Sequence, residues 1–195
     1  ADDLMQFGQR QRRVEIIAKR INSPNLVAVD MGGTSYDVSL VEDGRVHLVN
    51  EGEVDGCPVR LPMVEMRSIG AGGGSIARTD TIGGMFVGPE SAGAEPGPAC
   101  YGKNGAQPTV TDGNVILGRI DPAHFLGGAM ALDAEAARIA VAGKVAKPLG
   151  LGVEETAEGI IQVAVAHMAS AIRLSLFEKG LDPEDFSLIS FGGAG

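Results

Sequence analysis

Residues 26–42 read LVAVDMGGTSYDVSLVE, and this stretch decides the fold of the chain. Two apolar runs rich in β-branched residues, Leu26–Met31 and Tyr36–Glu42, lie on either side of a glycine pair, which is typical of two strands joined by a tight loop. Asp43-Gly44 then gives a two-residue hairpin signal before a third β-like run, Arg45–Glu51. The sequence therefore predicts three consecutive β-strands.

The loop between the first two strands carries groups suited to phosphate binding. Asp30 places a carboxylate at the end of the first strand, and two glycines let the backbone approach a ligand closely. Hydroxyl groups follow on the turn, so the loop offers a cradle for phosphate oxygens and a handle for Mg²⁺-bound water. The alternative is a hairpin whose glycines fit a tight turn and whose aspartate caps it. The candidate residues are Asp30 and Asp37 for catalysis, Asp30 also for Mg²⁺, and Gly32, Gly33, Thr34 and Ser35 for cofactor binding.

A second glycine-rich loop, IGAGGGSIA at residues 69–77, is another candidate site. Its consecutive amides could bind phosphate or substrate, and it contains a weak G-x-G-x-x-A match. We reject a dinucleotide site because the preceding Glu65–Ser68 is a poor buried strand and the surrounding pattern is not βαβ. No G-x-x-x-x-G-K-[ST] sequence occurs, which excludes the P-loop mode of ATP binding. The candidate residues in this loop are Gly72, Gly73, Gly74 and Ser75.

The composition limits the classes of partner. The chain has 195 residues, enough for one domain, and its 29 glycines are about double the usual share of roughly 7%. A net charge of −9 and an aromatic content of 4% without tryptophan argue against a nucleic-acid-binding face. No run of about 18 apolar residues and no signal-peptide pattern occurs, so we expect no membrane span. Two cysteines, Cys57 and Cys100, suit free thiols in a reducing cytoplasm.

The rest of the chain predicts an α/β domain with a long insertion. The region from about 54 to 131 is rich in Gly and Pro with short apolar stretches, which is typical of a loop-rich β insertion. Asp133 then provides an N-cap for one helix, and Gly180 a C-cap for the next. A buried strand that opens into glycines leaves an uncovered face, so we expect the natural protein to continue beyond Gly195 and to begin before Ala1. The predicted helices are 10–21, 133–147 and 154–179, the last with Ile161, Val165, Met168, Ile172 and Leu176 on its apolar face, and the predicted buried strand is 186–191.

This order of elements and motifs resembles a known fold. The order is a hairpin, a long insertion, two helices, a strand and a glycine loop. It resembles the ribonuclease-H-like half domain of the actin/Hsp70/sugar-kinase superfamily, in which an Asp-x-Gly-Gly-Thr hairpin binds phosphates. Several long motifs narrow the resemblance to the hydantoinase/oxoprolinase family, over roughly residues 26–195. These motifs are DMGGTSYDV at 30–38, SIGAGGGSIA at 68–77, VGPESAGAEPGPACYG at 87–102, PTVTDGNVILGRI at 108–120 and FSLISFGGAG at 186–195.

The resemblance implies a larger ATP-dependent subunit. Residues 1–25 are then a helical lead-in or a shortened segment, and residues 26–195 form the family's domain. Gly192 and Gly193 support the adenosine, while ATP and Mg²⁺ lie between this half and an amino-terminal half with its own hairpin. The expected partners are that missing half, a second subunit of hydantoinase B type, and a small cyclic amide or ketone as substrate.

Four further residues within these motifs have both a functional and a plainer interpretation. Glu90 and Glu95 are acid or base groups, or they cap loop turns. Cys100 touches substrate or metal, or is a simple thiol, because two lone cysteines lack the spacing of a metal site. Asp112 faces the cleft, or belongs to a turn. The histidines His47, His124 and His167 are predicted to be structural, the last at the core or boundary of its helix.

Two classes of function remain. In the first, ATP phosphorylates the carbonyl oxygen of a hydantoin-type or oxoproline-type cyclic amide, which turns a poor leaving group into a good one. A ketone carboxylase subunit would share this ATP step, and the alternative class is a non-catalytic nucleotide-binding module. The long insertion favours an enzyme, because functional residues concentrate on loops held by a rigid scaffold. We favour the hydrolase, since nothing in the chain demands further carboxylase machinery, and we expect the fragment alone to be inactive.

Overall fold

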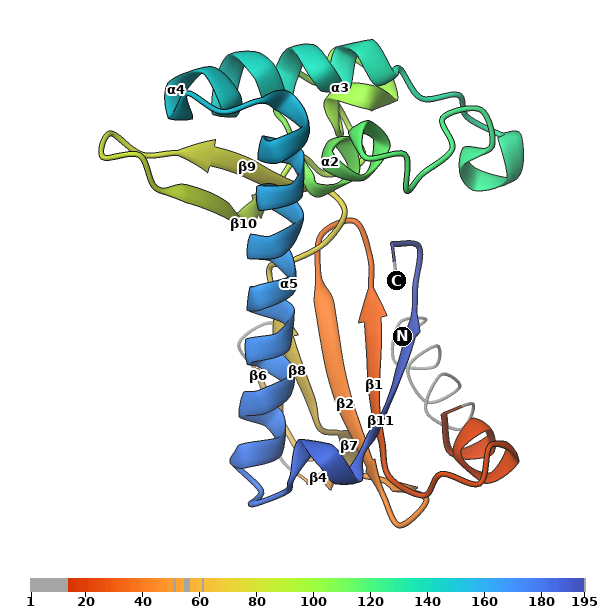
Figure 1. Cartoon of the computed structure of the whole chain (residues 1–195). Coiled ribbons are helices and arrows are strands. Elements are labelled where there is room, and N and C mark those ends of the chain that lie inside the picture. The colour runs from red at the N-terminus through yellow and green to blue at the C-terminus, as the bar shows by residue number, and fades with distance from the viewer. Residues whose placement is uncertain (1–13, 51, 55–56, 61, 195) are drawn as a thin grey trace.

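The core of the molecule is a mixed β-sheet. The computed structural model describes residues 14–50, 52–54, 57–60 and 62–194. The strands follow the order β11-β1-β2-β3, with β8 also paired to β2 (Figure 1). β11 is parallel to β1, and the other pairs are antiparallel. The bounds are β1 Leu26–Met31, β2 Tyr36–Glu42, β3 Arg45–Val46, β8 Met66–Ile69 and β11 Ser187–Phe191.

The two strands predicted on either side of the glycine loop form with the predicted bounds. Successive side chains of a strand point to opposite faces, so β1 divides its apolar residues between two cores. Val27 and Val29 belong to one cluster, and Leu26 and Ala28 to the other. Burial on both faces explains why β1 is apolar along most of its length.

The predicted third strand, Arg45–Glu51, is only partly correct. The turn before it has positive φ angles of 51° at Asp43 and 75° at Gly44, as a two-residue hairpin requires. The run breaks at His47, and β4 (Leu48–Val49) pairs with β7 (Met63–Val64) instead of continuing along β2. Glu51 lies outside the described residues.

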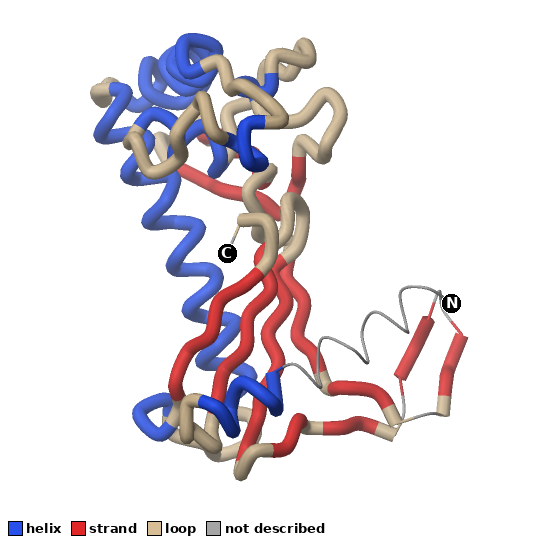
Figure 2. The backbone as a smooth tube through the Cα atoms, turned by 90° about the vertical axis from the view of Figure 1, so that its right-hand side faces the viewer, coloured by secondary structure: helices blue, strands red, loops and turns tan. Residues whose placement is uncertain are grey.

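Helix α5 (Val153–Phe177) lies along one face of the sheet (Figures 1 and 2). Ile160 and Leu176 are fully buried, in the same cluster as Val27 and Val29 of β1. The helix ends slightly before the predicted 179, and Gly180, at φ 70°, donates its N–H to the carbonyl of Phe177. This helix was correctly predicted from its periodicity and its terminal glycine.

The apolar face of α5 agrees with the predicted one except at Val165. Ile161 and Leu176 are buried and Met168 and Ile172 pack against the core, whereas Val165 is 53% exposed. The buried face also includes Ile160, Ala164 and Ala171. By length and composition α5 is also apolar enough to cross a membrane, with a mean hydropathy of 1.6 over its most apolar window. The core helix of a globular domain passes the same test, and α5 packs on the sheet.

A second helix covers the opposite face of the sheet. Residues 14–20 are helical, and Val14 and Ala18 pack against Leu26 and Ala28 of β1. Residues 10–13 of the predicted helix lie outside the described residues.

The predicted insertion is more regular than a loop-rich segment. It holds the hairpin of β9 (Ser75–Thr79) and β10 (Met85–Ser91). It also holds α2 (Val110–Ile116), which packs against α5. The predicted turn at residues 111–114 is therefore wrong: these residues form the start of α2, because Thr109 and Asp112 make a capping box. The insertion also includes the short pair β5 (Gly52–Val54) and β6 (Cys57–Val59).

The predicted helix at 133–147 is present and continues slightly further. The Asp133 side chain accepts a hydrogen bond from the N–H of Ala136, which confirms it as the N-cap. α3 (Ala134–Val141) continues through a π-helical segment, Ala142–Ala146, into α4 (Lys147–Leu149). Figure 1 shows these helices grouped with β9, β10 and α2 at one end of the sheet.

β11 is an edge strand and not the buried strand that its sequence predicts. Among the described strands it pairs with β1 alone, and Leu188 is 60% exposed. Its register with β1 matches Ile189 to Ala28 and Phe191 to Asp30. The apolar side chains of β11 that face the helix of residues 14–20 are therefore only half-buried.

Candidate functional site

The loop joining β1 to β2 has backbone donors available at its tip. The N–H of Gly32 donates to the carbonyl of Ser35 at 3.0 Å and closes the loop. Gly33 and Thr34 are exposed, and within the described part of the chain their N–H groups have no hydrogen-bond partner. The tip can therefore donate to a ligand that approaches from outside.

Two carboxylates stand side by side just below this tip. Asp30 and Asp37 are direct partners in the β1–β2 register, so their side chains project from the same face of the sheet. That face is the one away from α5, since Asp30 alternates with Met31 and Val29 along β1. Asp37 accepts hydrogen bonds from the hydroxyl of Ser68 and, at 3.4 Å, from the hydroxyl of Ser35. Ser68 thus orients one carboxylate.

The glycine loop after β11 approaches the same carboxylates. Gly192 has φ 103°, and a Cβ added there would collide with the carboxylate of Asp30 and the backbone of Met31. The N–H of Ala194 donates to the carbonyl of Met31 at 2.9 Å. A glycine is required at 192 because both its conformation and its surroundings exclude a side chain.

These three segments enclose a cavity of about 590 Å³, here called the hairpin cavity. Its polar wall includes Asp30, Gly32, Ser35, Asp37, Gly192 and Gly193, all of them predicted site residues. Its apolar wall comes from the helix of residues 14–20 and from β11, through Val14, Ile17, Ile189 and Phe191. The volume is that of a small-ligand pocket. Gly33 and Thr34 lie at the tip and do not line it.

The second glycine loop supports the first loop and does not form a separate cradle. The N–H of Gly73 donates to the carbonyl of Gly32 at 3.0 Å, and that of Gly74 to Gly33 at 2.7 Å. The N–H of Gly72 is bound by the hydroxyl of Ser75 at 2.8 Å. The amides predicted to bind phosphate or substrate are therefore already used within the protein, because the two loops pack backbone to backbone.

Thr111 of α2 holds this second loop in place. Its N–H and its hydroxyl both donate to the carbonyl of Gly73, each at 2.8 Å. Thr111 is buried, and its partner Gly73 is in turn bonded to the hairpin loop. The roles of Thr111 and Ser68 could not be predicted from the sequence, because each acts through a residue far away in the chain. The only sequence signal was that both belong to motifs of the family resemblance.

Asp112 and Cys100 lie inside the protein and away from the hairpin cavity. Asp112 is fully buried and accepts hydrogen bonds from the N–H groups of Ala99, Cys100 and Thr109 and from the Thr109 hydroxyl. Cys100 is also fully buried. Burial, followed by the nearby charge of Asp112, raises the pKa of the Cys100 thiol. A protonated, enclosed thiol is a poor nucleophile.

Glu90 and Glu95 are also outside the hairpin cavity. Glu90 is exposed on β10, and Glu95 is exposed in the following loop, 3.9 Å from the ammonium group of Lys103. His167 is exposed on α5, so its prediction as a core or boundary residue is wrong. His47 and His124 pair with Glu42 and Asp121 respectively.

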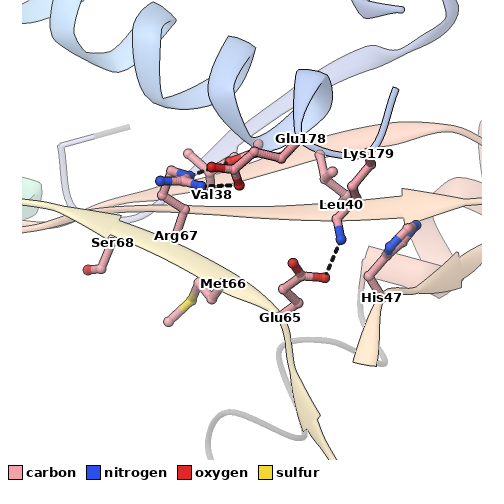
Figure 3. Close-up of a pocket in the computed structure, with 10 residues that line it drawn as sticks. Val38, Leu40, His47, Glu65, Met66, Arg67, Ser68, Glu178 and Lys179 are labelled. Carbon is pink, nitrogen blue, oxygen red and sulfur yellow. Dashed lines mark hydrogen bonds and ion pairs between the residues drawn. The ribbon is translucent and has the colours of Figure 1, made fainter. Parts of the chain in front are cut away.

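A smaller cavity of about 320 Å³ lies between β2, β8 and the end of α5, and Figure 3 shows its lining residues. Arg67 forms an ion pair with Glu178 and donates to the hydroxyl of Ser175 at 3.2 Å. Lys179 pairs with Glu65 at 2.6 Å. Both cations have partners from the opposite element, so these contacts join α5 to β8 and the segment before it.

Asp30 and Asp37 are the candidate metal ligands in the hairpin cavity. Over the described residues, no group of three or more His, Cys, Asp and Glu side chains could hold one. Asp30 and Asp37 are two carboxylates, and one or two carboxylates are enough for Mg²⁺ when water and substrate phosphates supply its other ligands. The donor set therefore fits Mg²⁺ bound together with a phosphate-bearing substrate.

Comparison with known proteins gives a consistent set of relatives. A family model described as Hydantoinase/oxoprolinase matches residues 13–195. The chain is 46% identical over 178 residues to caprolactamase subunit alpha of Pseudomonas jessenii, covering 91% of this chain and 26% of that protein. It is 44% identical over 180 residues to the acetophenone carboxylase gamma subunit of Aromatoleum aromaticum, covering 91% of this chain and 25% of that protein.

The fold is also similar to a solved structure. The crystal structure of the ATP-dependent caprolactamase from Pseudomonas jessenii aligns with a TM-score of 0.83 and 43% identity. The alignment covers 93% of this chain and 26% of the other. The chain therefore spans about a quarter of the length of these relatives.

Proposed function

The chain belongs to the hydantoinase/oxoprolinase family, and from this premise we propose that it is part of an ATP-dependent enzyme that phosphorylates the carbonyl oxygen of a cyclic amide. One observation carries the proposal most strongly. Asp30, Asp37 and the β1–β2 loop, predicted from their chemistry, meet at one cavity with Gly192 and Gly193, which the family resemblance assigns to the adenosine. A hairpin needed only for a tight turn would not require Gly192 to pack against Asp30.

The hairpin cavity and the loop tip beside it each have a role in this proposal. The tip amides of Gly33 and Thr34 donate hydrogen bonds to phosphate oxygens, and Asp30 and Asp37 hold Mg²⁺ through its water ligands. The apolar wall at Ile189 and Phe191 accommodates the base of the nucleotide, next to Gly192. Bound Mg²⁺ supplies positive charge that neutralises the transferring phosphoryl group.

ATP is a substrate, and the step conserves atoms and electrons. The bond from the γ-phosphorus to its bridging oxygen breaks, and the electron pair leaves with ADP. The amide carbonyl oxygen forms the new bond to phosphorus, and the amide N–H proton is released. One water then adds to the activated carbon as the C–N bond breaks, and a second water releases phosphate. Preorganised donors at the tip stabilise the charge that develops during transfer.

We also propose that this domain is one part of a larger enzyme. We assign the domain to the ribonuclease-H-like half of an actin-type ATPase, with the insertion at about 54–131 and residues 1–25 as a lead-in. The chain spans only about a quarter of the relatives' length. This supports the expectation that an amino-terminal half and a hydantoinase B-type subunit complete the enzyme. The buried free thiol of Cys100 suits a cytoplasmic location.

A ketone carboxylase is the second candidate. It is favoured by the 44% identity to an acetophenone carboxylase subunit. Both reactions begin with phosphorylation of a carbonyl or enol oxygen, and they differ only in whether water or a carboxyl donor meets the activated species. A non-catalytic nucleotide-binding module is the remaining alternative.

Asp30→Asn in the full-length protein tests the ATP site. We expect ATP turnover to fall roughly 10²-fold with the fold intact, as loss of one preorganised electrostatic group does. Asp43→Asn is the matched control: it makes the same change at the other end of β2, where asparagine tolerates the positive φ. Near-normal ATP turnover in a folded Asp30→Asn protein would show that Asp30 has only a structural role next to the turn.

The reaction itself is decided by phosphate release from the full-length protein with its neighbouring subunit. One set of reactions contains hydantoins, lactams and oxoproline, and the other contains ketones with bicarbonate. Stimulation by the first set supports the hydrolase, and stimulation by the second alone establishes the carboxylase. If neither set stimulates phosphate release, the result supports the non-catalytic module.

A further inference from the structure

A second, larger cavity lies on the other side of the hairpin loop. It encloses about 860 Å³ between the loop tip and the helices of the insertion, and it is called here the upper cavity. Met31, Gly33 and Gly193 form its floor. Gly193 also lines the hairpin cavity, so the two cavities meet at this residue. A phosphoryl group held at the loop tip would face the upper cavity.

One wall of the upper cavity is apolar. Tyr101 and Phe125 place their ring centres 5.7 Å apart, and Met130 is packed in the same cluster. Leu126 is 66% exposed, although it belongs to a segment that lines the cavity. Aromatic and aliphatic walls of this kind bind the hydrocarbon body of a ligand.

The charged side chains that line this cavity all have partners. Lys103 lies 3.9 Å from Glu95, and Arg119 donates to Glu158 at 2.9 Å. His124 is paired with Asp121 at 2.7 Å. A carboxylate group on a ligand would therefore compete with Glu95, Glu158 and Asp121 for these cations.

Two polar side chains in the lining remain available. Within the described residues, neither the side-chain amide of Asn114 nor the hydroxyl of Tyr101 has a hydrogen-bond partner. Both can donate to a carbonyl oxygen. By contrast, the hydroxyl of Thr111, on the same wall, already donates to Gly73.

We propose that the upper cavity binds the acceptor of the phosphoryl group, and that this acceptor is an uncharged carbonyl compound with an apolar body. This inference rests on the proposed function. The carbonyl oxygen faces Gly33 and accepts from Asn114 or Tyr101, and the hydrocarbon part lies against Phe125, Leu126 and Met130. Among cyclic amides, the cavity therefore selects an unsubstituted lactam over one that carries a carboxylate.

The ligand test uses a matched pair of lactams with the full-length protein. 2-Pyrrolidinone and 5-oxoproline share one ring and differ by a carboxylate. We expect the uncharged ring, or a larger uncharged lactam or ketone, to bind at least tenfold more tightly in calorimetry than 5-oxoproline. Equal or tighter binding of 5-oxoproline overturns the inference, and so does the absence of binding by every uncharged acceptor.

Leu126→Asp tests the location. We expect the KM and the Kd for the uncharged acceptor to rise at least tenfold, because the leucine loses its apolar contact and a charge is introduced. The Kd for ATP should stay the same. Ile82→Asp is the matched control, since Ile82 is 91% exposed in the β9–β10 turn and lines neither cavity. Equal acceptor affinity in Leu126→Asp and Ile82→Asp would refute the location.

The two proposals fail in different ways. Loss of ATP binding and turnover in the unaltered protein would contradict the proposed function. The acceptor site alone would be contradicted by a different result. In that result ATP turnover is normal, and the acceptor affinity is the same with or without a carboxylate on the lactam and with or without Leu126→Asp.

Discussion

Asp112 shows how one residue can look functional in the sequence and act as internal support. Its carboxylate accepts hydrogen bonds from three backbone N–H groups and one hydroxyl, and no part of it is exposed. These bonds tie the start of α2 to the segment around Cys100. A carboxylate with this many donors is satisfied where it is, so it has no remaining capacity for substrate.

At the residue scale, we predict that Cys100 resists ionisation and alkylation. The thiol of an unfolded chain ionises near pH 8.5, whereas burial and Asp112 raise the pKa of folded Cys100. The resulting stability is fully present below about pH 8.5 and is lost as the pH rises, because only the unfolded chain releases the proton. In a Cys57→Ser background, native protein should react with iodoacetamide at pH 8.5 at least tenfold more slowly than protein in urea.

The control for this prediction is Cys100→Ala in the same background. Its free energy of unfolding should fall less between pH 7.5 and pH 9.5 than that of the parent protein. Equal alkylation rates in native and denatured protein, or an identical pH dependence in the two proteins, would show that the thiol is accessible.

At the scale of elements, the two glycine loops behave as one unit. Gly73 and Gly74 each donate to a carbonyl of the β1–β2 loop, and Thr111 fixes Gly73 from the other side. This arrangement connects α2 to the tip of the hairpin through hydrogen bonds to the backbone of Gly73. Glycine is required at 72 and 74 because the two backbones approach too closely there for a Cβ.

We predict that Gly72→Ala disrupts this unit. The added Cβ would lie 2.7 Å from the carbonyl oxygens of Gly32 and Gly33, and backbone atoms cannot move aside cheaply. The free energy of unfolding should fall by about 1–3 kcal/mol, as overpacking does, and the affinity for ATP should fall with it. Urea denaturation and calorimetry of the full-length protein measure the two effects.

Gly143→Ala is the control, because nothing lies within 4 Å of the Cβ it would add. Its stability should be unchanged or slightly higher, since alanine favours a helix. If Gly72→Ala were as stable and as active as Gly143→Ala, the packing of the two loops would not matter.

At the scale of the whole molecule, the hairpin tip lies where the sheet meets the group of helices α2, α3 and α4 (Figure 1). Figure 2 shows the chain end near the tips of the strands, with the helical group above and α5 to one side. The sheet supplies the carboxylates and the insertion supplies the acceptor wall. The hairpin cavity has no cover from a second domain within the described residues.

We predict that residues 1–195 alone bind ATP only weakly. This chain supplies only one side of the proposed ATP cleft, so ATP would make about half of its contacts and stay exposed to water. The dissociation constant for ATP should therefore be well above the micromolar range. Isothermal calorimetry on this chain and on the full-length protein measures the difference. Binding at about −8 kcal/mol or tighter by the chain alone would contradict a site shared with another domain.

The sequence by itself determined the elements that depend on neighbouring residues. β1, β2 and their turns follow from apolar alternation and from Asp43-Gly44, and α5 follows from its periodicity and Gly180. It also predicted Asp30 and Gly32 as site residues from local chemistry, and Gly192 and Gly193 through the family resemblance, and all four line the hairpin cavity. The family was likewise evident from the order of long motifs.

Only the tertiary structure decided how these parts are used. β11 was predicted to be buried and lies at an edge, since strand order depends on which distant segments pair. The second glycine loop was predicted to be a cradle, yet its amides bind Gly32 and Gly33. Ser68 and Thr111 gain their roles from partners 31 and 38 residues away. Hydrogen bonds between distant residues leave no periodic pattern in the sequence, so only the folded chain reveals them.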